Sequence, residues 1–369
     1  MERAASASRA IVLTEVEQLE GAERSVVALS RWLQERGLEH HFVVYEDRAG
    51  LAARAGHPVE VVQLLPGDGA RRRALALRAY FAKAQGAWRP LVSGYQAALH
   101  ATLGGVRGFH CLMHDTPTLF EEAGPTGVYA HGYRWASNRV VRLGLRSGGQ
   151  TMVTSEFLQR DCRRLFGVDA AIARMGGYSG TPPQRGPKTS AGMRMLSLSR
   201  IEGNKRIDWV LRALAAMERG AAPLSARTDW RLDVAGRGAE LEAMTLLAKE
   251  LGLSGRVRFH GYVSDAELER LYGEADLFLM PAVQGYGIPA IEALGRGLHV
   301  LVHRESGVSD LLLTTPWVTV MNGGEEAMLD AMNRAVETTL LGAFRAVPQP
   351  PLPTEDSWAE QVATLCGWV

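Results

Sequence analysis

A glycine-containing loop between an apolar run and a helix-forming segment carries the residue types best suited to chemistry in this chain. The run 276–280 is apolar, ends before a proline and is typical of a buried parallel strand. Gly285 and Gly287 follow in the loop, and Pro289 suits the first turn of a helix, where a missing N–H is tolerated. Because free backbone N–H groups at the positive end of a helix bind anions, we expect an anion site here. A diphosphate is the anion that we favour.

One acidic side chain lies in the same segment. An apolar face recurs at helical spacing in Ile288, Ile291 and Leu294. Glu292 falls on a different face, near the N-terminal end of the expected helix. On spacing alone, Glu292 is an exposed acid that the helix dipole stabilises.

Short apolar runs alternate with amphipathic segments along the whole chain, which predicts parallel sheets with helical crossovers. In the first half we expect strands at 10–14, 40–46, 59–65, 109–115 and, as the last one, 151–155, with helices at 19–37, 71–85 and 156–167. In the second half we expect strands at 193–199, 231–236, 256–261, 276–280 and 298–304, with helices at 207–214, 240–253 and 264–275. Ser264 is the expected N-cap of the last of these helices.

The domain organisation follows from length and from one linker-like segment. A chain of 369 residues exceeds the usual size of one hydrophobic core. The segment 176–192 contains five glycines and three prolines and is the best linker candidate. We expect two doubly wound, Rossmann-like α/β domains that face each other across a cleft, the first at 1–180 and the second at 193–349, joined by a linker at 181–192. Ligands are expected at the carboxyl ends of the strands.

Composition argues against several classes of partner. A net charge of +1 and a pI near 7.8 do not favour a nucleic-acid binder. No apolar run is long enough to cross a bilayer, and the first residues lack the apolar core of a signal peptide, so we expect a cytoplasmic protein. The cysteines Cys111, Cys162 and Cys366 are far apart and predict buried free thiols.

The fingerprints of other nucleotide-binding and hydrolytic folds are absent from the sequence. The dinucleotide pattern fails because Leu241 stands at its third glycine, and there is no P-loop. No Gly-x-Ser-x-Gly elbow occurs. There is no Asp-x-Asp pair either, so we expect no metal and no other cofactor in the site.

The order and spacing of several segments resemble the retaining glycosyltransferases of family 4, which have the GT-B fold and take a sugar from a nucleotide diphosphate. These segments are 19–33, 113–117, 153–161, 196–208, 233–244, 257–265, 275–310 and 357–365. The last of them resembles the terminal helix that crosses back in that fold, so the resemblance implies that 350–369 return to the first domain.

The resemblance implies roles for residues of the second domain. Arg200 and Lys205 match the basic pair that holds the donor diphosphate, whose negative charge must be stabilised when it leaves. Without the resemblance, the two are side chains of a solvated, mixed-charge loop. Glu292 matches the second acid of the family's Glu-x7-Glu signature, which accepts from the ribose hydroxyls. The backbone below the diphosphate would come from Gly285, Tyr286, Gly287 and Ile288, and Val263 and its neighbours would contact the base.

This sequence departs from the family at the first acid of that signature. Position 284 is Gln, where the family has a Glu that faces the transferred sugar. An amide can donate and accept hydrogen bonds but carries no negative charge. Two interpretations stand, namely a tuned donor preference with a differently stabilised transition state, or a site whose catalytic power has decayed. We favour an active site, because the other matching residues are present.

The first domain offers two further candidates. Gly21 matches one of two glycines that the family places near the donor phosphates, and Glu20 stands at the other, which weakens the match. His114 matches a histidine that contacts the donor sugar near the reacting carbon. Its position at the carboxyl end of an expected strand favours this role over that of a structural histidine.

An arginine-rich stretch at 71–90 allows two interpretations. It is either a solvated helix face or a surface that lies on an anionic membrane leaflet. The nearby arginines Arg134, Arg139, Arg142 and Arg146 extend the patch or bind an anionic acceptor.

The resemblance therefore implies a metal-independent, retaining glycosyltransferase with a front-face mechanism. It would move a hexosyl unit from a UDP- or GDP-sugar to a glycan, a lipid-linked sugar or a small glycoside. The alternatives are a catalytically weakened sugar-nucleotide-binding subunit of a glycosyltransferase complex and a sugar-nucleotide epimerase of the same fold.

Overall fold

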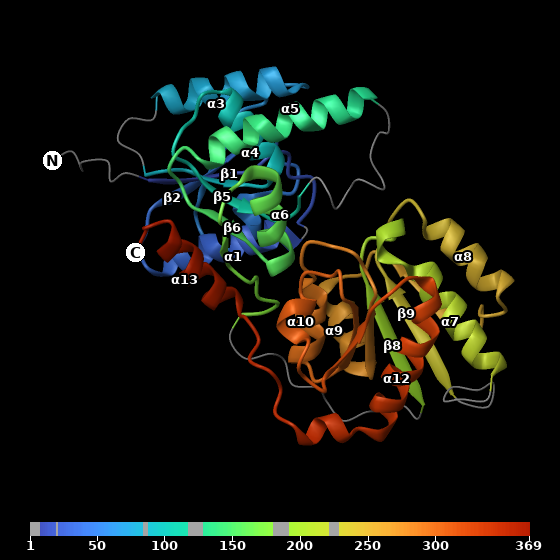
Figure 1. Cartoon of the computed structure of the whole chain (residues 1–369). Helices are drawn as coiled ribbons and strands as arrows, with labels where there is room; N and C mark the ends of the chain where they lie inside the picture. Colours follow the sequence, from blue (N-terminus) through green and yellow to red (C-terminus); the bar gives the residue numbers. More distant parts are fainter. Residues whose placement is uncertain (1–7, 20, 84–87, 117–127, 180–191, 221–228) are drawn as a thin grey trace. The chain divides into compact units, whose positions relative to one another are not determined.

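Two separate parallel sheets form the framework of the protein (Figure 1). The computed structural model describes residues 8–19, 21–83, 88–116, 128–179, 192–220 and 229–369. The chain divides into one unit of Met1–Gly180 with Pro353–Val369 and a second unit of Thr181–Leu352. No helix among the described residues has the length and hydropathy needed to cross a membrane.

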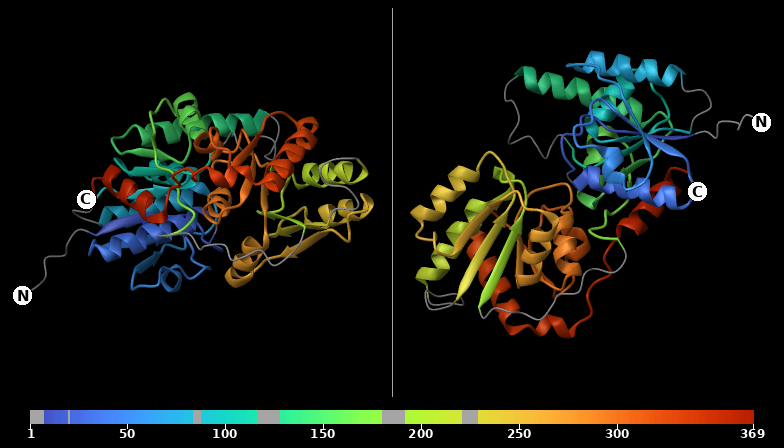
Figure 2. Two further views of the ribbon diagram at one scale, coloured as in Figure 1. Left: turned by 90° about the horizontal axis from the view of Figure 1, so that it is seen from below. Right: turned by 180° about the vertical axis from the view of Figure 1, so that it is seen from behind.

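The first unit contains a seven-stranded sheet in the order β3-β2-β1-β4-β5-β6-β7. Its strands are β1 (Arg9–Val12), β2 (His40–Val44), β3 (Glu60–Gln63), β4 (Leu91–Ser93), β5 (His110–Met113), β6 (Thr151–Val153) and β7 (Ala171–Ile172). Its helices are α1 (Gly21–Glu35), α2 (Leu51–Ala55), α3 (Ala70–Lys83), α4 (Tyr95–Leu103), α5 (Val128–Leu145) and α6 (Glu156–Phe166). Helices α3, α4 and α5 cover one face of the sheet and α1 covers the other (Figures 1 and 2).

Five of these elements, β4, β7, α2, α4 and α5, were not expected from the sequence. Strand β4 has three residues and passes through one glycine into α4, which leaves no room for a recognisable alternation. The prediction that 151–155 form the last strand of this half is wrong, because β7 pairs in parallel with β6. Two residues are too few to show a period in the sequence.

The second unit contains a six-stranded sheet in the order β10-β9-β8-β11-β12-β13. Its strands are β8 (Met193–Leu198), β9 (Trp230–Ala235), β10 (Val257–Gly261), β11 (Leu277–Met280), β12 (His299–His303) and β13 (Val318–Met321). Its α-helices are α7 (Ile207–Arg219), α8 (Leu241–Glu250), α9 (Asp265–Glu274), α10 (Ile288–Gly295), α11 (Ser309–Leu312) and α12 (Met328–Leu341). The expected strands and helices are present, and Ser264 caps α9 by accepting from the N–H of Glu267 at 3.3 Å. Strand β13 and helices α11 and α12 are additions to the expected set.

The last helix, α13 (Glu355–Leu365), belongs to the first unit together with the rest of residues 353–369. It packs against α1. The backbone N–H of Glu355 donates to the carbonyl of Tyr178 at 2.9 Å, and the Arg9 guanidinium in β1 donates to the carbonyl of Trp368 at 3.0 Å. A Cβ on Gly176 would lie 2.0 Å from the backbone of Thr354, so the two segments can cross only because residue 176 has no side chain.

Each sheet has one point where the chain reverses the direction in which it adds strands. In the first sheet this point lies between β1 and β4, and in the second between β8 and β11. All strand pairs in both sheets are parallel, so the carboxyl ends of the strands in one sheet meet at one edge. Ligands of open α/β sheets bind at such reversal points. The three cysteines are buried free thiols, as expected.

Candidate functional site

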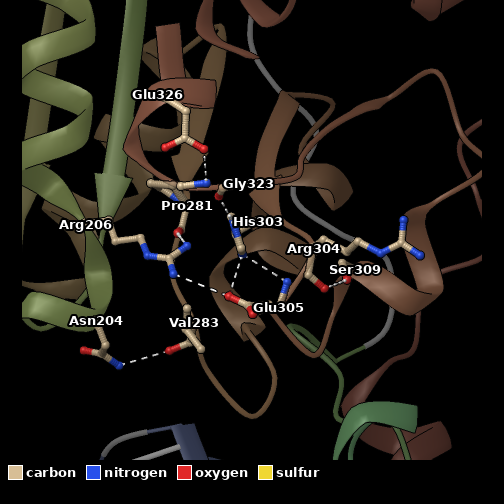
Figure 3. A network of polar contacts seen from close by, with 11 residues as sticks. Asn204, Arg206, Pro281, Val283, His303, Arg304, Glu305, Ser309, Gly323 and Glu326 are labelled. Carbon is tan, nitrogen blue, oxygen red and sulfur yellow. Dashed lines mark hydrogen bonds and ion pairs between the residues drawn. The ribbon is translucent and has the colours of Figure 1, made fainter. Parts of the chain in front are cut away.

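The loops that leave β8 and β11 are tied together at the reversal point of the second sheet. Asn204 donates through Nδ2 to the carbonyl of Val283 at 3.1 Å, and the N–H of Val283 donates to the carbonyl of Asn204 at 3.0 Å (Figure 3). Asn204 lies in a single 3-10 turn, Gly203–Lys205, between β8 and α7. This reciprocal pair fixes the position of the turn relative to the loop after β11.

Lys205 points inward from this turn. Its exposed fraction is 9%, and its Nζ donates to Oε1 of Gln284 at 2.7 Å. The amide nitrogen of Gln284 in turn contacts Sδ of Met280 at 3.0 Å. A hydrogen bond from an ammonium group is short and strong, so it orients the amide. The interpretation of Lys205 as a solvated loop residue is therefore wrong.

Arg200 behaves differently. Its side chain is half exposed and forms an ion pair with Glu202 at 3.0 Å, two residues further along the same loop. Exposed pairs of this kind contribute about 0–1 kcal/mol and exchange readily for another anion. The structure thus places Arg200 on the surface of the loop and Lys205 beneath it.

The loop before α10 is shaped by one glycine. Gly287 has a φ of 136°, and a Cβ there would lie 2.5 Å from Cε of Met280 and 2.8 Å from Nε2 of Gln284. Gly287 is the N-cap of α10, and Pro289 lies in the first turn, as expected. Gly285 and Tyr286 are buried, whereas Ile288 is half-buried. Only glycine permits this close approach of the backbone to the Gln284 side chain.

A second loop, after β12, holds the first in place. The N–H of Gly307 donates to the carbonyl of Gln284 at 2.9 Å, and the hydroxyl of Ser306 donates to the carbonyl of Tyr286 at 2.9 Å. Ser306 is buried. Sequence reasoning missed these residues, although their place after the expected strand 298–304 puts them at the same sheet edge.

A polar network supports the site from the β12 and β13 side (Figure 3). Arg206 donates to the carbonyl of Pro281 at 3.4 Å and pairs with Glu305 at 3.4 Å. The N–H of Glu305 donates to Nδ1 of His303 at 3.1 Å, and Nε2 of His303 lies 3.0 Å from the carbonyl of Gly323. Nδ1 therefore accepts while Nε2–H donates, which is the pattern of a neutral imidazole. Burial lowers the pKa of His303, in agreement with this assignment.

Glu292 is buried, with an exposed fraction of 4%. Its Oε2 accepts a hydrogen bond from the Tyr272 hydroxyl of α9 at 2.9 Å. The interpretation as an exposed acid is wrong. Residues 290–294 are all buried, because elements pack against α10 on more than one side.

In the first unit, His114 follows β5 and lies next to the end of β4. Its Nε2 is 2.9 Å from the hydroxyl of Ser93, the last residue of β4. Burial lowers the pKa of His114 to about 4, so the imidazole is neutral near pH 7. Gly21 is the first residue of α1, and its carbonyl accepts from the Ser25 hydroxyl at 2.9 Å. Glu20 lies outside the described residues.

Val263 is half-buried between β10 and the N-cap of α9. Beside it, the exposed ring of Tyr262 lies under the guanidinium of Arg237, 5.5 Å from the ring centroid. The second sheet therefore brings together Lys205, Gln284 and the 285–288 backbone at its reversal point, and it places Val263 at the same edge. Among the described residues, no group of three or more His, Cys, Asp or Glu side chains has the arrangement of a metal site.

Both halves of the chain match glycosyltransferase families. Residues 19–175 match the family described as Glycosyltransferase Family 4, and residues 184–338 match the family described as Glycosyl transferases group 1. A GDP-mannose-dependent alpha-(1-6)-phosphatidylinositol monomannoside mannosyltransferase of Mycolicibacterium smegmatis is 28% identical over 59% of this chain. That match covers 61% of the relative, so the chain spans less than two thirds of its length.

Solved structures with the same fold cover nearly the whole chain. Sucrose-phosphate synthase of Thermosynechococcus elongatus superposes with a TM-score of 0.74 at 16% identity, over 98% of both chains. Anabaena HepE in complex with UDP gives a TM-score of 0.73 at 15% identity, over 98% of this chain and all of the other. At such identities the likeness concerns the fold.

Proposed function

Because this chain belongs to the family 4 glycosyltransferases with the GT-B fold, we propose that it transfers a hexosyl unit from a nucleotide-diphosphate sugar to an acceptor hydroxyl. The observation that carries this proposal is the buried Lys205 ammonium at the reversal point of the second sheet, beside Gln284 and the Gly287 turn. A cation beside a helix N-terminus at such a point suits a diphosphate.

We assign the diphosphate to Lys205, Arg200 and the backbone of 285–288. The leaving group gains negative charge as the glycosidic bond breaks, and a fixed ammonium stabilises that charge without a metal ion. Arg200 can leave its exposed partner Glu202 to join it. We assign the ribose to Glu292, whose carboxylate Tyr272 holds at 2.9 Å, and the base to the backbone near Val263.

We propose a retaining, front-face reaction. The acceptor hydroxyl attacks the anomeric carbon from the face that the diphosphate leaves, and the leaving phosphate oxygen takes the acceptor proton. Gln284 cannot act as a nucleophile, unlike the carboxylate of a retaining glycosidase. Its amide, oriented by Lys205, is suited to hydrogen bonds with sugar hydroxyls, and so is His114.

The proposal also covers the nucleotide of the donor and the chemical class of the acceptor. UDP and GDP are the two nucleotides that we propose to compare. The likeness to the mycobacterial mannosyltransferase makes GDP-mannose the first donor to test, and it makes a lipid-linked inositol sugar the first acceptor to test. The acceptor would otherwise be a glycan or a small glycoside.

A cytoplasmic enzyme with a lipid-linked acceptor would need a surface that meets the membrane. On α5, Tyr133 and Trp135 have exposed fractions of 60% and 63%, and the guanidinium of Arg139 lies 4.9 Å from the Trp135 ring centroid. Helix α3 adds the exposed Arg71 and Arg72. Arginine with exposed aromatic rings suits peripheral contact with anionic lipids. Co-sedimentation with anionic vesicles tests this, and binding that is absent or unaffected by salt contradicts it.

A second candidate is a sugar-nucleotide-binding subunit with little activity of its own. The observation that favours it is Gln284, an amide where the family has an acid. Incubation of the purified protein with GDP-mannose, UDP-glucose and acceptor decides between the two. Nucleotide release together with a glycosylated product supports the enzyme, whereas tight nucleotide binding without turnover supports the binding subunit.

A further inference from the structure

The hydroxyl of Ser93 forms a hydrogen bond with Nε2 of His114. The two residues come from neighbouring parallel strands, with Ser93 opposite Leu112 in the register of β4 and β5. The backbone after Ser93 is fixed as well, because the N–H of Gly94 donates to the carbonyl of Leu112 at 2.7 Å. The 2.9 Å contact between Ser93 Oγ and His114 Nε2 is therefore set by the sheet rather than by a loop.

The direction of this hydrogen bond follows from the surroundings of Ser93. Its side chain is buried, and within the described part of the chain its hydroxyl contacts His114 alone. If Ser93 accepted from Nε2–H, its own proton would be buried without an acceptor, which costs about 1–3 kcal/mol. Donation to the Nε2 lone pair satisfies the Ser93 proton and leaves only the Nδ1–H without a partner, whereas the reverse bond leaves both the Ser93 proton and the Nδ1 lone pair without one. A neutral imidazole whose Nε2 accepts carries its proton on Nδ1.

Nδ1 of His114 is buried and has no hydrogen-bond partner among the residues that the structure describes. It lies at the carboxyl end of β5, next to the reversal point between β1 and β4. A buried N–H donor at such an edge is suited to an oxygen of a bound ligand.

We propose that Ser93 is a positioning residue that holds His114 in the Nδ1–H form, so that His114 donates a hydrogen bond to a sugar hydroxyl of a substrate bound at the carboxyl edge of the first sheet. The consequence for catalysis rests on the proposed function, whereas the proton position does not. Ser93 acts through His114 and need not touch the substrate.

The test is ¹⁵N NMR of the whole protein with labelled histidine, in which the two neutral forms give different nitrogen shifts. The His114 signals are assigned as those that His114→Gln removes. We expect the proton on Nδ1 in the wild type and in Ser93→Thr, and a shift toward Nε2–H in Ser93→Ala. Ser30→Ala is the control and should leave the His114 signals unchanged, because Ser30 contacts Nε2 of His40 at 2.7 Å and Nε2 of His57 at 3.1 Å elsewhere in the first unit.

A proton on Nε2 in the wild type, or His114 signals that Ser93→Ala leaves unchanged, would overturn the proposal. Kinetics form the second arm. Ser93→Ala should lower kcat about tenfold with little change in the donor KM, and Ser93→Thr should restore kcat. A wild-type protein that transfers no sugar refutes the proposed function and leaves the NMR result to decide the proton position.

Discussion

Replacement of Lys205 by Met removes one positive charge from the proposed diphosphate site and keeps most of the volume of the side chain. Lys205 is the one cation that the structure shows buried at this point among the described residues of the loops after β8 and β11. An anionic oxygen at the 2.7 Å distance of the present Gln284 acceptor would interact with Nζ by about 6 kcal/mol, for an effective dielectric constant of about 20. Desolvation offsets part of this attraction.

A loss of about 3 kcal/mol of transition-state stabilisation is the usual result when one preorganised donor is removed. We therefore expect kcat/KM for the donor to fall about 100-fold in Lys205→Met, since each factor of ten corresponds to about 1.4 kcal/mol. The assay is the release of GDP or UDP with acceptor present, together with calorimetric titration of the free nucleotide. Nucleotide affinity should fall as well, and it should lose part of its salt dependence.

Two controls separate this effect from a general loss of structure. Lys249→Met removes an exposed lysine from α8 of the same unit, and it should leave turnover and affinity unchanged. Thermal unfolding of Lys205→Met reports the cost of leaving Oε1 of Gln284 without its donor, about 1–3 kcal/mol. Wild-type kcat and nucleotide affinity in a folded Lys205→Met would refute the assignment of the diphosphate.

Three further predictions concern the same fold. Glu292→Gln should weaken nucleotide binding, measured by calorimetry, about tenfold if the carboxylate holds the ribose. Tyr272→Phe removes the hydroxyl 2.9 Å from Oε2 of Glu292 and should weaken binding less. Equal effects of the two substitutions would contradict a direct contact between Glu292 and the ribose. Gly287→Ala should abolish nucleotide binding and lower the melting temperature, because the new Cβ would lie 2.5 Å from Met280 and the φ of 136° disfavours any side chain. Gly255→Ala is the control and should change neither property, because a Cβ at residue 255 has no atom within 4 Å. Burial lowers the pKa of His299 to about 4, so its neutral form stabilises the fold above the unfolded pKa of about 6.5, and this contribution is lost as the pH falls toward 4. The free energy of unfolding should therefore drop over that window by up to about 1.4 kcal/mol per pH unit for this group, and less steeply in His299→Gln; identical slopes in denaturant titrations would exclude the effect.

The alternation of strands and helices could be predicted from the sequence because most strands are apolar runs next to amphipathic helices. The exceptions are short or directly joined elements such as β4 and β7, which carry no period of their own. Their place in the sheet depends on pairing with β5 and β6, and these contacts are not encoded locally.

The burial of charged residues could not be predicted from local spacing. Lys205 lies in a polar stretch, yet it is covered because the loop after β11, about 80 residues away, supplies Gln284 as its acceptor. Glu292 is covered because Tyr272 of α9 packs over it. The hydrogen bonds that Ser306 and Gly307 donate to the loop before α10 are tertiary contacts of the same kind. In each case the partner comes from another element of the sheet edge.

The position of α13 has a consequence for the order in which the protein can fold during synthesis. The first unit begins at the N-terminus, but it is completed by residues 353–369, which are made after the whole second unit. Until then, the face of α1 that α13 covers has no partner, and the Arg9 guanidinium lacks the carbonyl of Trp368. Domains usually fold in the order in which they leave the ribosome. Here the second unit can be finished before the first, because the helix that completes the first unit follows the second unit in the chain.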